Sequence, residues 1–591
     1  MTSGTRVQRG AMGGPASGVS GAWRFRWIAA PWAVVLAFVG MAALRIVAPA
    51  SDAYSRLDWS AGLLTDEGFY SHNARNVVLF GHARTDDFNN MLVSPLLHAL
   101  QVGVFRVFGP GVVPLRMISV VCSLFTLLLL WSALRPVFGR GVAFAAVCFL
   151  GFDHVAVLYH RLGLMDTPAS LPATAALWAF SRAALADGRV RSRWLCVVGL
   201  LLGLTLAVRS LCAYLAPAPL IALWAVARVE GRPTADRAAS AKLWALVLGP
   251  FALAVAAYGA FWWLPHRAEL AVMNRYYLYH QLLPGSPAHL WANVTHAILG
   301  DYRGLFPYLF RHTPAVFVLA LAWLAGAALR TPREDGGYAA RAVETYVTAW
   351  LLLGWTLLAV VAYSPSRYYV STYPALAAVA ALGLRDLPRI WERIWRPDGR
   401  ARVARALLAW LVAYHAVEGV AFHRGFAPRF VLVALLYAAP TLLAALSVTR
   451  PVSSRVGGLQ VGRAAAVLLL VGWAGVNAAW LTDWAMHIRY TQLGMSRWLS
   501  RNLPRGSVLL GDVAPGVSMD ARFVSVNIIP RLCNDVRPVE RFAGRPRFAV
   551  ILDGRWKEAY WLQRYPALVR AERRILLRRV LRWDIGVYAV D

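Results

Sequence analysis

The chain has 591 residues, 58% of them hydrophobic and only 15% charged, and its mean hydropathy is +0.50. This composition excludes a set of ordinary soluble domains. It indicates a polytopic, mostly α-helical membrane protein, because a backbone in lipid must satisfy its own polar groups. The net charge of +31 does not indicate a nucleic-acid partner, since the basic residues are scattered through short loops. The five cysteines form no CxxC pair and predict neither a disulfide framework nor a zinc site.

The N-terminal segment 1–28 begins with a glycine- and serine-rich stretch and is predicted to be disordered and cytoplasmic. Residues 29–483 are predicted to form a transmembrane domain, because apolar segments that can cross a hydrocarbon core of about 30 Å recur throughout them. We expect about thirteen spans, at 29–49, 112–134, 141–159, 168–185, 194–208, 211–227, 243–264, 314–329, 344–363, 370–384, 406–422, 430–448 and 464–482.

One further apolar segment, 92–109, is interrupted by proline and by polar residues. If it does not cross, the arginine-rich loops, such as 182–193 and 385–402, all lie on the same side as the N-terminus. A crossing would move every later basic loop to the other side. The positive-inside rule therefore favours an interfacial helix over 92–109 and a cytoplasmic N-terminus in the plasma (inner) membrane.

This topology places the first loop, 50–111, and the C-terminal segment, 484–591, on the extracytoplasmic side. In the C-terminal segment the apolar runs shorten to strand length and turn residues separate them. A helix is predicted at 488–502, and strands are predicted at 507–513, 522–529, 547–554 and 583–590. We therefore predict a small α/β domain that acts as a cover or an acceptor-docking module.

Carboxylates stand out in two of the outer loops. Asp66 and Glu67 follow the first span, and Asp166 follows the predicted span 141–159. A solvated loop is the structural alternative for the first pair, and a helix N-cap ahead of Pro168 is the alternative for Asp166. If Asp66 and Asp166 face one polar site, they can share acid–base work or hold a cation.

Arginines at the outer turns are the second group of candidates. Arg209 lies between two apolar spans, and Arg367 and Tyr368 begin another outer turn. An arginine this close to hydrocarbon is costly unless it is paired, and its planar fork fits a phosphate. Snorkelling to the interface is the structural alternative. His98 and Arg275 are further candidates for the same phosphate-binding role.

The chain resembles the GT-C glycosyltransferases, in particular the protein O-mannosyltransferases and the lipid A aminoarabinose transferases. Five segments in the expected order carry the resemblance: TDEGFYSHNARN (65–76), SPLLHAL (94–100), RLGLMDTPAS (161–170), GLTLAVRSLCAYLAP (203–217) and SPSRYYVSTYPALA (364–377). His98 and Arg209 stand where lysines are usual in that family. The resemblance implies a transmembrane GT-C domain with a C-terminal extracytoplasmic domain.

The resemblance further implies sugar transfer from a polyprenyl-phosphate donor to an acceptor hydroxyl on a lipid, glycan or protein, with inversion. Asp66 would be the general base, Asp166 and Glu67 would support the site, and Arg209 and Arg367 would stabilise the departing phosphate. A divalent cation near the acids stays an open alternative, because no ligand spacing decides it. A lipid or solute transporter is the rival function. The sequence shows neither an inverted repeat nor a charge near the middle of a predicted span, which are features that transporters often have.

Overall fold

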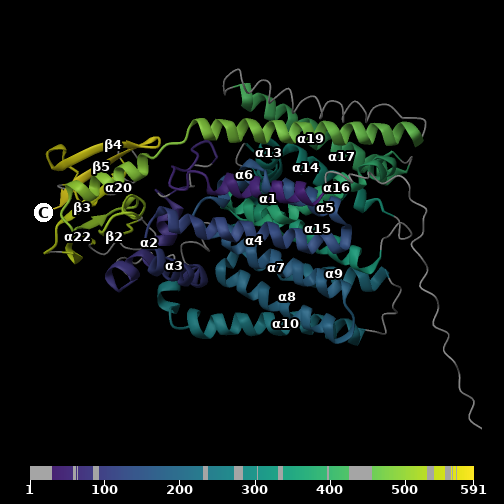
Figure 1. The fold of residues 1–591 in the computed structure, drawn as a ribbon, viewed down its shortest axis with the longest axis horizontal. Coiled ribbons are helices and arrows are strands. Elements are labelled where there is room, and N and C mark those ends of the chain that lie inside the picture. Colours follow the sequence, from purple (N-terminus) through teal and green to yellow (C-terminus); the bar gives the residue numbers. More distant parts are fainter. Residues whose placement is uncertain are drawn as a thin grey trace, which may run out of the picture.

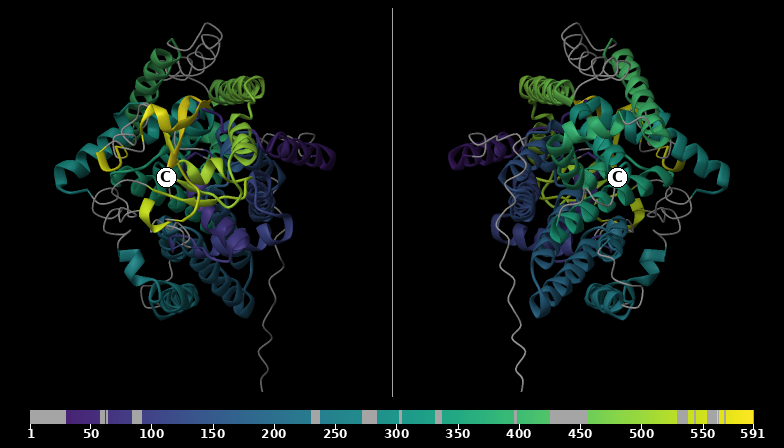
Figure 2. Two further views of the ribbon diagram at one scale, coloured as in Figure 1. Left: turned by 90° about the vertical axis from the view of Figure 1, so that its left-hand side faces the viewer. Right: turned by 90° about the vertical axis from the view of Figure 1, so that its right-hand side faces the viewer.

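The computed structural model describes residues 30–57, 62, 64–83, 92–229, 237–271, 284–301, 304–330, 337–395, 398–424, 455–528, 538–542, 544–552, 561, 563–566 and 569–590. Within these residues the chain is mostly helical, with a small sheet near the C-terminus. Long helices run side by side along the long axis of the molecule, and the sheet lies beyond one end of the helical bundle (Figures 1 and 2). The predicted fold class, a helical membrane domain with a small C-terminal α/β region, is therefore confirmed.

The bundle contains α1 and most of the helices from α4 to α19. The helices are α1 (Pro31–Ile46), α4 (Val112–Phe138), α5 (Arg140–Gly151), α6 (His154–His160), α7 (Asp166–Leu185), α8 (Gly188–Val208), α9 (Pro217–Val229), α10 (Arg237–Tyr258), α12 (Pro287–Leu299), α13 (Leu305–His312), α14 (Pro314–Ala328), α15 (Tyr338–Val360), α16 (Tyr373–Ile394), α17 (Gly399–Arg424) and α19 (Arg455–Met486). Three short segments interrupt the series: the 3₁₀ helices η2 (Ser210–Leu215) and η7 (Ser366–Thr372), and the π-helical turn η4 (Gly259–Trp263).

Six helices of the described chain are long and apolar enough to cross a membrane, and seven if α5 and α6 together form one span. The expected number of thirteen is therefore not confirmed. Two of the expected spans, α1 and α14, are shorter apolar helices. The expected span 430–448 lies outside the described residues. The multi-pass character of the protein nevertheless follows from these helices.

The expected span 141–159 is broken, because α5 and α6 meet at an angle of 63°. Buried polar side chains satisfy the backbone groups that the break exposes. Arg45 Nη1 donates to Gly151 O at 2.8 Å, and Asp153 Oδ1 accepts from the first N–H groups of α6. Asn477 Oδ1 accepts from His154 N at 2.7 Å. These residues therefore stabilise a bend that the apolar sequence alone does not predict.

The segment 50–111, predicted to be extracytoplasmic, contains α2 (Asp66–Phe80) and α3 (Pro95–Phe108). Gly81 ends α2 in the left-handed conformation, with φ of 78°, which glycine adopts without strain. Helix α3 has 14 residues, whereas a spanning helix needs about 20. Its length agrees with the expectation that 92–109 forms a helix that does not cross.

The C-terminal sheet has strands β1 (Val508–Leu510), β2 (Val524–Val526), β3 (Arg547–Leu552), β4 (Arg574–Val580) and β5 (Trp583–Val590). Their order is β2-β1-β3-β5-β4; β1 is parallel to both neighbours, and the pairs β3–β5 and β5–β4 are antiparallel. The helical elements here are α20 (Thr491–Asn502), α21 (Ala514–Val517), α22 (Pro538–Arg541) and η8 (Ala571–Arg573). Strand β4 was not expected, because its sequence RILLRRV is rich in arginine.

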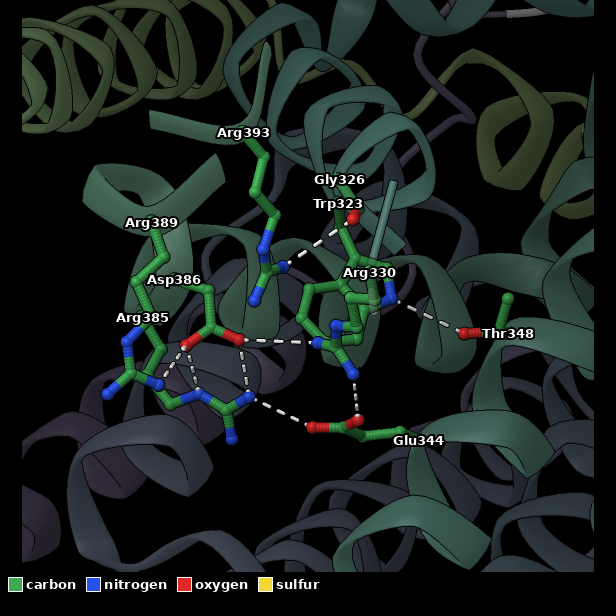
Figure 3. A network of polar contacts seen from close by, with 9 residues as sticks. All are labelled: Trp323, Gly326, Arg330, Glu344, Thr348, Arg385, Asp386, Arg389 and Arg393. Atoms are coloured by element: carbon green, nitrogen blue, oxygen red, sulfur yellow. Dashed lines mark hydrogen bonds and ion pairs between the residues drawn. The ribbon is translucent and has the colours of Figure 1, made fainter. Parts of the chain in front are cut away.

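A network of arginines and carboxylates ties together the last part of α16, the start of α15 and the residues after α14 (Figure 3). Arg330 and Arg385 both contact Glu344, at 2.7 and 2.9 Å. Arg385 also contacts Asp386 at 2.6 Å, and Arg389 lies 3.9 Å from it. We call these five residues the α16 network. It lies roughly 20 Å along α16 from Tyr373, at 1.5 Å per residue.

Candidate active site

Two ion pairs bring together four of the residues that the sequence analysis selected. Asp66 Oδ2, at the start of α2, lies 3.2 Å from Arg367 Nη1 in η7. Asp166, at the start of α7, contacts Arg209, the residue that follows α8. Each pair joins elements that lie far apart in the sequence. Acids and arginines from four separate segments are therefore neighbours in the fold.

Tyr368 joins the two pairs. The guanidinium carbon of Arg209 lies 4.4 Å from the centre of its ring, and that of Arg367 lies 4.9 Å away. Both distances are within the range of a cation–π contact. Tyr70, one turn after Asp66, lies within electrostatic range of both arginines. We call Asp66, Asp166, Arg209, Arg367 and Tyr368 the acid–arginine cluster.

The four charged side chains of the acid–arginine cluster are almost completely shielded from solvent, and Tyr368 is half-buried. The exposed fractions of the side chains are 11% for Asp66, 2% for Asp166, and 4% for each of Arg209 and Arg367. Burying an ion pair costs free energy that further hydrogen bonds must offset. Asp166 Oδ2 and Arg209 Nε are buried without a hydrogen-bond partner among the described residues. The cluster thus has unused polar atoms, which a polar ligand can satisfy.

Local breaks in the helices place these side chains. Arg209 ends α8 in an extended conformation, with φ of −152° and ψ of 107°, before η2 begins. Arg367 lies in η7, between Pro365 and Pro374, and Pro374 lies in the first turn of α16, which begins at Tyr373. The N-cap of α7 is Met165, so Asp166 is not the cap that the structural alternative supposed. Its carboxylate faces Arg209 instead.

Comparisons with known proteins support the fold. The family model described as dolichyl-phosphate-mannose-protein mannosyltransferase matches residues 93–261. No curated protein matches the chain by sequence. The crystal structure of ArnT from Cupriavidus metallidurans bound to undecaprenyl phosphate is similar over 94% of this chain and 98% of that chain, with 15% identity and a TM-score of 0.57. The apo structure of ArnT is similar over 94% and 97%, with 16% identity and a TM-score of 0.51.

The chain has the fold of the GT-C glycosyltransferases. The resemblance drawn from the five sequence segments is thereby confirmed. In this fold helix α2 and the C-terminal region lie at the same end of the bundle as the acid–arginine cluster, since α2 carries Asp66 and borders the sheet (Figure 1). The candidate catalytic residues of the described chain therefore lie at the end of the bundle that faces the C-terminal sheet.

Glu67, which follows Asp66 in the sequence, has a different environment from that of Asp66. Its two carboxylate oxygens accept from Nε and Nη2 of Arg116, both at 2.8 Å, and Oε1 also accepts from Gly163 N at 2.7 Å. The side chains of Glu67 and Arg116 are 0% and 3% exposed. Both oxygens are thus occupied within the protein, which assigns Glu67 to holding α2 in place.

Arg116 is a residue that the sequence analysis missed. It lies in the first turns of the apolar helix α4, and its Nη1 donates to Pro49 O at 3.0 Å and to Ser51 O. The sequence contained one indication of this role: Arg116 is a single arginine near the start of the otherwise apolar segment 112–134, which follows the loop that carries Glu67. An arginine in such a position is costly unless paired.

His98 does not join the acid–arginine cluster. Burial, with a smaller effect from His72, lowers its pKa to about 4, so the ring is neutral. Ser94, one turn earlier, donates to Val208 O, which ties α3 to the end of α8 beside Arg209. His98 therefore borders the site, and its phosphate-binding role stays a prediction. Arg275 lies outside the described residues.

Among the residues that the structure describes, no group of three or more histidine, cysteine or acidic side chains is arranged to hold a metal ion. Asp66 and Asp166 each contact a guanidinium group. A divalent cation at either carboxylate would have to displace an arginine.

Proposed function

We propose that this protein is an integral membrane glycosyltransferase that transfers a sugar from a polyprenyl-phosphate donor to an acceptor hydroxyl on the extracytoplasmic side, with inversion. The observation that carries the proposal is the convergence of Arg209 and Arg367 on Tyr368, each beside a carboxylate. ArnT, which shares the fold, has been solved with undecaprenyl phosphate. The predicted multi-pass plasma-membrane location, with a cytoplasmic N-terminus, belongs to the same proposal.

The two arginines suit a lipid-linked phosphate. Guanidinium groups form charge-assisted, paired hydrogen bonds with phosphate oxygens and stay protonated at every relevant pH. When the bond between the sugar and the phosphate breaks, negative charge develops on the departing phosphate. Arg209 and Arg367 would stabilise that charge in a site shielded from water, and such electrostatic stabilisation is commonly the largest catalytic contribution.

Asp66 is the proposed general base. The acceptor oxygen attacks the anomeric carbon and forms the new glycosidic bond. The bond from that carbon to the phosphate oxygen breaks, and its electron pair leaves with the polyprenyl phosphate. The acceptor proton passes to the Asp66 carboxylate. Because the attack is a single displacement from the opposite face, the configuration at the anomeric carbon inverts.

The ion pairs suggest how donor binding prepares the base. Arg367 contacts Asp66, which stabilises the ionised carboxylate and weakens it as a base. A bound phosphate competes for Arg367. A carboxylate that loses its guanidinium partner holds a proton more readily, so Asp66 would become a better base when the donor is in place. Asp166 would keep Arg209 oriented.

The acceptor class stays open among lipid, glycan and protein, and the surrounding membrane lipid is a further expected partner. A lipid or solute transporter is the rival function. Purified protein in vesicles separates the two classes, with a polyprenyl-phosphate sugar as donor and released polyprenyl phosphate as the readout. The proposal predicts release that needs an acceptor. Movement of intact donor across the bilayer without release would favour the transporter and contradict the proposal.

A further inference from the structure

Helix α2, whose first residue is Asp66, lies between the helical bundle and the C-terminal sheet (Figure 1). Contacts with the bundle involve its N-terminal turn, where Asp66 contacts Arg367 and Glu67 contacts Arg116. Contacts with the C-terminal region involve its later turns, near Arg75 and Asn76. The helix is therefore held at two places by two different parts of the chain.

Arg75 makes the strongest polar contacts with the C-terminal region. It is completely buried, and its Nη1 donates to Phe523 O at 2.9 Å while its Nη2 donates to Ala521 O. Asn76 Nδ2 donates to Ser525 O at 3.2 Å. All three acceptors are backbone carbonyls at or just before β2. These hydrogen bonds fix the position of the strand's backbone against α2 whatever side chains the strand carries.

Apolar contacts support the same junction. Met519, beside α21, is buried in one cluster with residues of α2, α3 and α4, namely Ala74, Phe105, Val112 and Leu115. Leu64, just before α2, is buried in the core of the C-terminal region with Met495 and Leu499. Phe80, the last residue of α2, packs against the core on the other face of the sheet. The C-terminal region thus contacts the segment just before α2 as well as the middle and the end of the helix.

Two more hydrogen-bonded ties fix the C-terminal region to the bundle side. The Asp52 carboxylate accepts from Thr491 N at 2.8 Å, from Thr491 Oγ1 at 2.6 Å and from Gln492 N at 3.0 Å, which satisfies the first N–H groups of α20. Asp520 Oδ1 accepts from Val112 N, at the start of α4, at 3.2 Å. The junction therefore has several independent contacts.

We propose that the C-terminal domain is a positioning element for the acid of the acid–arginine cluster, and that Arg75 is its main positioning residue. Arg75 lies roughly 14 Å along α2 from Asp66, at 1.5 Å per residue. A continuous helix transmits a displacement at one end to the other. The role differs from the cover or acceptor-docking module that the sequence analysis predicted. The inference rests on the proposed function for the chemistry of Asp66, while the junction itself does not depend on it.

The test compares full-length Arg75→Met and Arg75→Lys with Arg579→Met, a matched change at an exposed arginine on the edge strand β4. Hydrogen exchange over 66–80, sugar transfer and binding of undecaprenyl phosphate are measured for each. For Arg75→Met we expect exchange over 66–80 to quicken at least about tenfold and kcat to fall about 10- to 100-fold, because a displacement of about 1 Å can cost that much. Undecaprenyl phosphate affinity should stay within about twofold, and Arg75→Lys should recover part of the loss.

Several results would overturn the inference. Faster exchange over 66–80 with unchanged kcat would show that the position of α2 does not matter, and unchanged exchange would show that Arg75 does not hold it. Lost undecaprenyl phosphate binding would point to general damage. If Arg75→Met does not fold, Asn76→Ala, which removes one hydrogen bond, must show the same pattern more weakly. If the wild type neither binds undecaprenyl phosphate nor transfers sugar, the proposed function fails, while hydrogen exchange still decides whether the junction holds α2.

Discussion

Arginine and carboxylate side chains form two clusters among the described residues, the α16 network and the acid–arginine cluster. The two differ in how completely their carboxylate oxygens are paired and in how far their arginines are exposed to solvent. In the α16 network all four oxygens of Glu344 and Asp386 accept from arginine (Figure 3). Two of its arginines reach solvent, with side-chain exposed fractions of 32% for Arg385 and 60% for Arg389. In the acid–arginine cluster the arginines are only 4% exposed, and Asp166 Oδ2 has no partner within the described chain.

The difference separates a structural contact from a candidate site. A partly solvated network in which every carboxylate oxygen accepts from arginine gains little from a further ligand and serves to hold helix ends together. A buried cluster with unused polar atoms is costly for the protein alone, and buried, strongly interacting ionisable groups gather at functional sites. The same residue types thus support different roles, and the predictions below test that distinction.

The largest effect is expected for Asp66→Asn. The asparagine keeps the shape of the side chain but cannot accept the acceptor proton. Transfer should therefore fall about 10²- to 10⁴-fold, the range that general base catalysis contributes. Steady-state turnover in purified protein measures it, with Asp187→Asn as the control, since that side chain is 98% exposed. Turnover like that of the wild type would remove Asp66 from the mechanism.

Replacement of the arginines comes next. Arg209→Met and Arg367→Met should each lower kcat about 10²- to 10³-fold, because each removes a donor that stabilises the leaving phosphate. Lysine at either position should retain part of the activity, since it keeps the charge and loses the fork. The control is Arg389→Met in the α16 network. Equal losses of kcat in Arg389→Met and Arg209→Met would show that the α16 network and the acid–arginine cluster do not differ in role.

A smaller functional effect and a large stability effect are expected for Glu67→Gln. The change leaves Arg116 buried without its carboxylate, which should cost about 3–5 kcal/mol. Thermal unfolding in detergent measures this loss, and turnover per folded molecule should change less than in Asp66→Asn. A Glu67→Gln protein of unchanged stability that has lost its turnover would instead assign a chemical role to Glu67.

The smallest effect is expected for Glu344→Gln in the α16 network. It removes a charged acceptor from Arg330 and Arg385, so stability should fall by about 1–3 kcal/mol. Turnover should stay within about twofold of the wild type, since the network lies roughly 20 Å along α16 from the start of that helix. A tenfold loss of turnover at unchanged stability would contradict the structural role given to the network.

Much of the candidate site could be predicted from the sequence, because its residues carry a recognisable cost. Asp66, Asp166, Arg209 and Arg367 are charges at the ends of apolar segments on one predicted side, and a shared site accounts for all four together. Their pairing could not be predicted, since it depends on how α2, α7, α8 and η7 meet in space. The same limit applies to Arg75, which reads in the sequence as one arginine of a polar loop.

The fold shows a similar division. The apolar segments predicted the bundle, and the short runs after residue 484 predicted four of the five strands. Strand β4 was not predicted, because the arginines of this edge strand obscure the alternation of apolar and polar residues that is typical of a strand. The bend between α5 and α6 was not predicted, because Arg45 and Asn477, which hydrogen-bond to the backbone at the bend, lie more than 100 residues away in sequence.

The most direct test of the central claim is a structure of the protein in a lipid nanodisc with undecaprenyl phosphate bound. We predict phosphate oxygens within hydrogen-bond distance of both Arg209 and Arg367 beside Tyr368, with Asp66 moved more than about 4 Å from Arg367, the limit of an ion pair. A phosphate bound elsewhere, with both ion pairs of the acid–arginine cluster intact, would contradict the account.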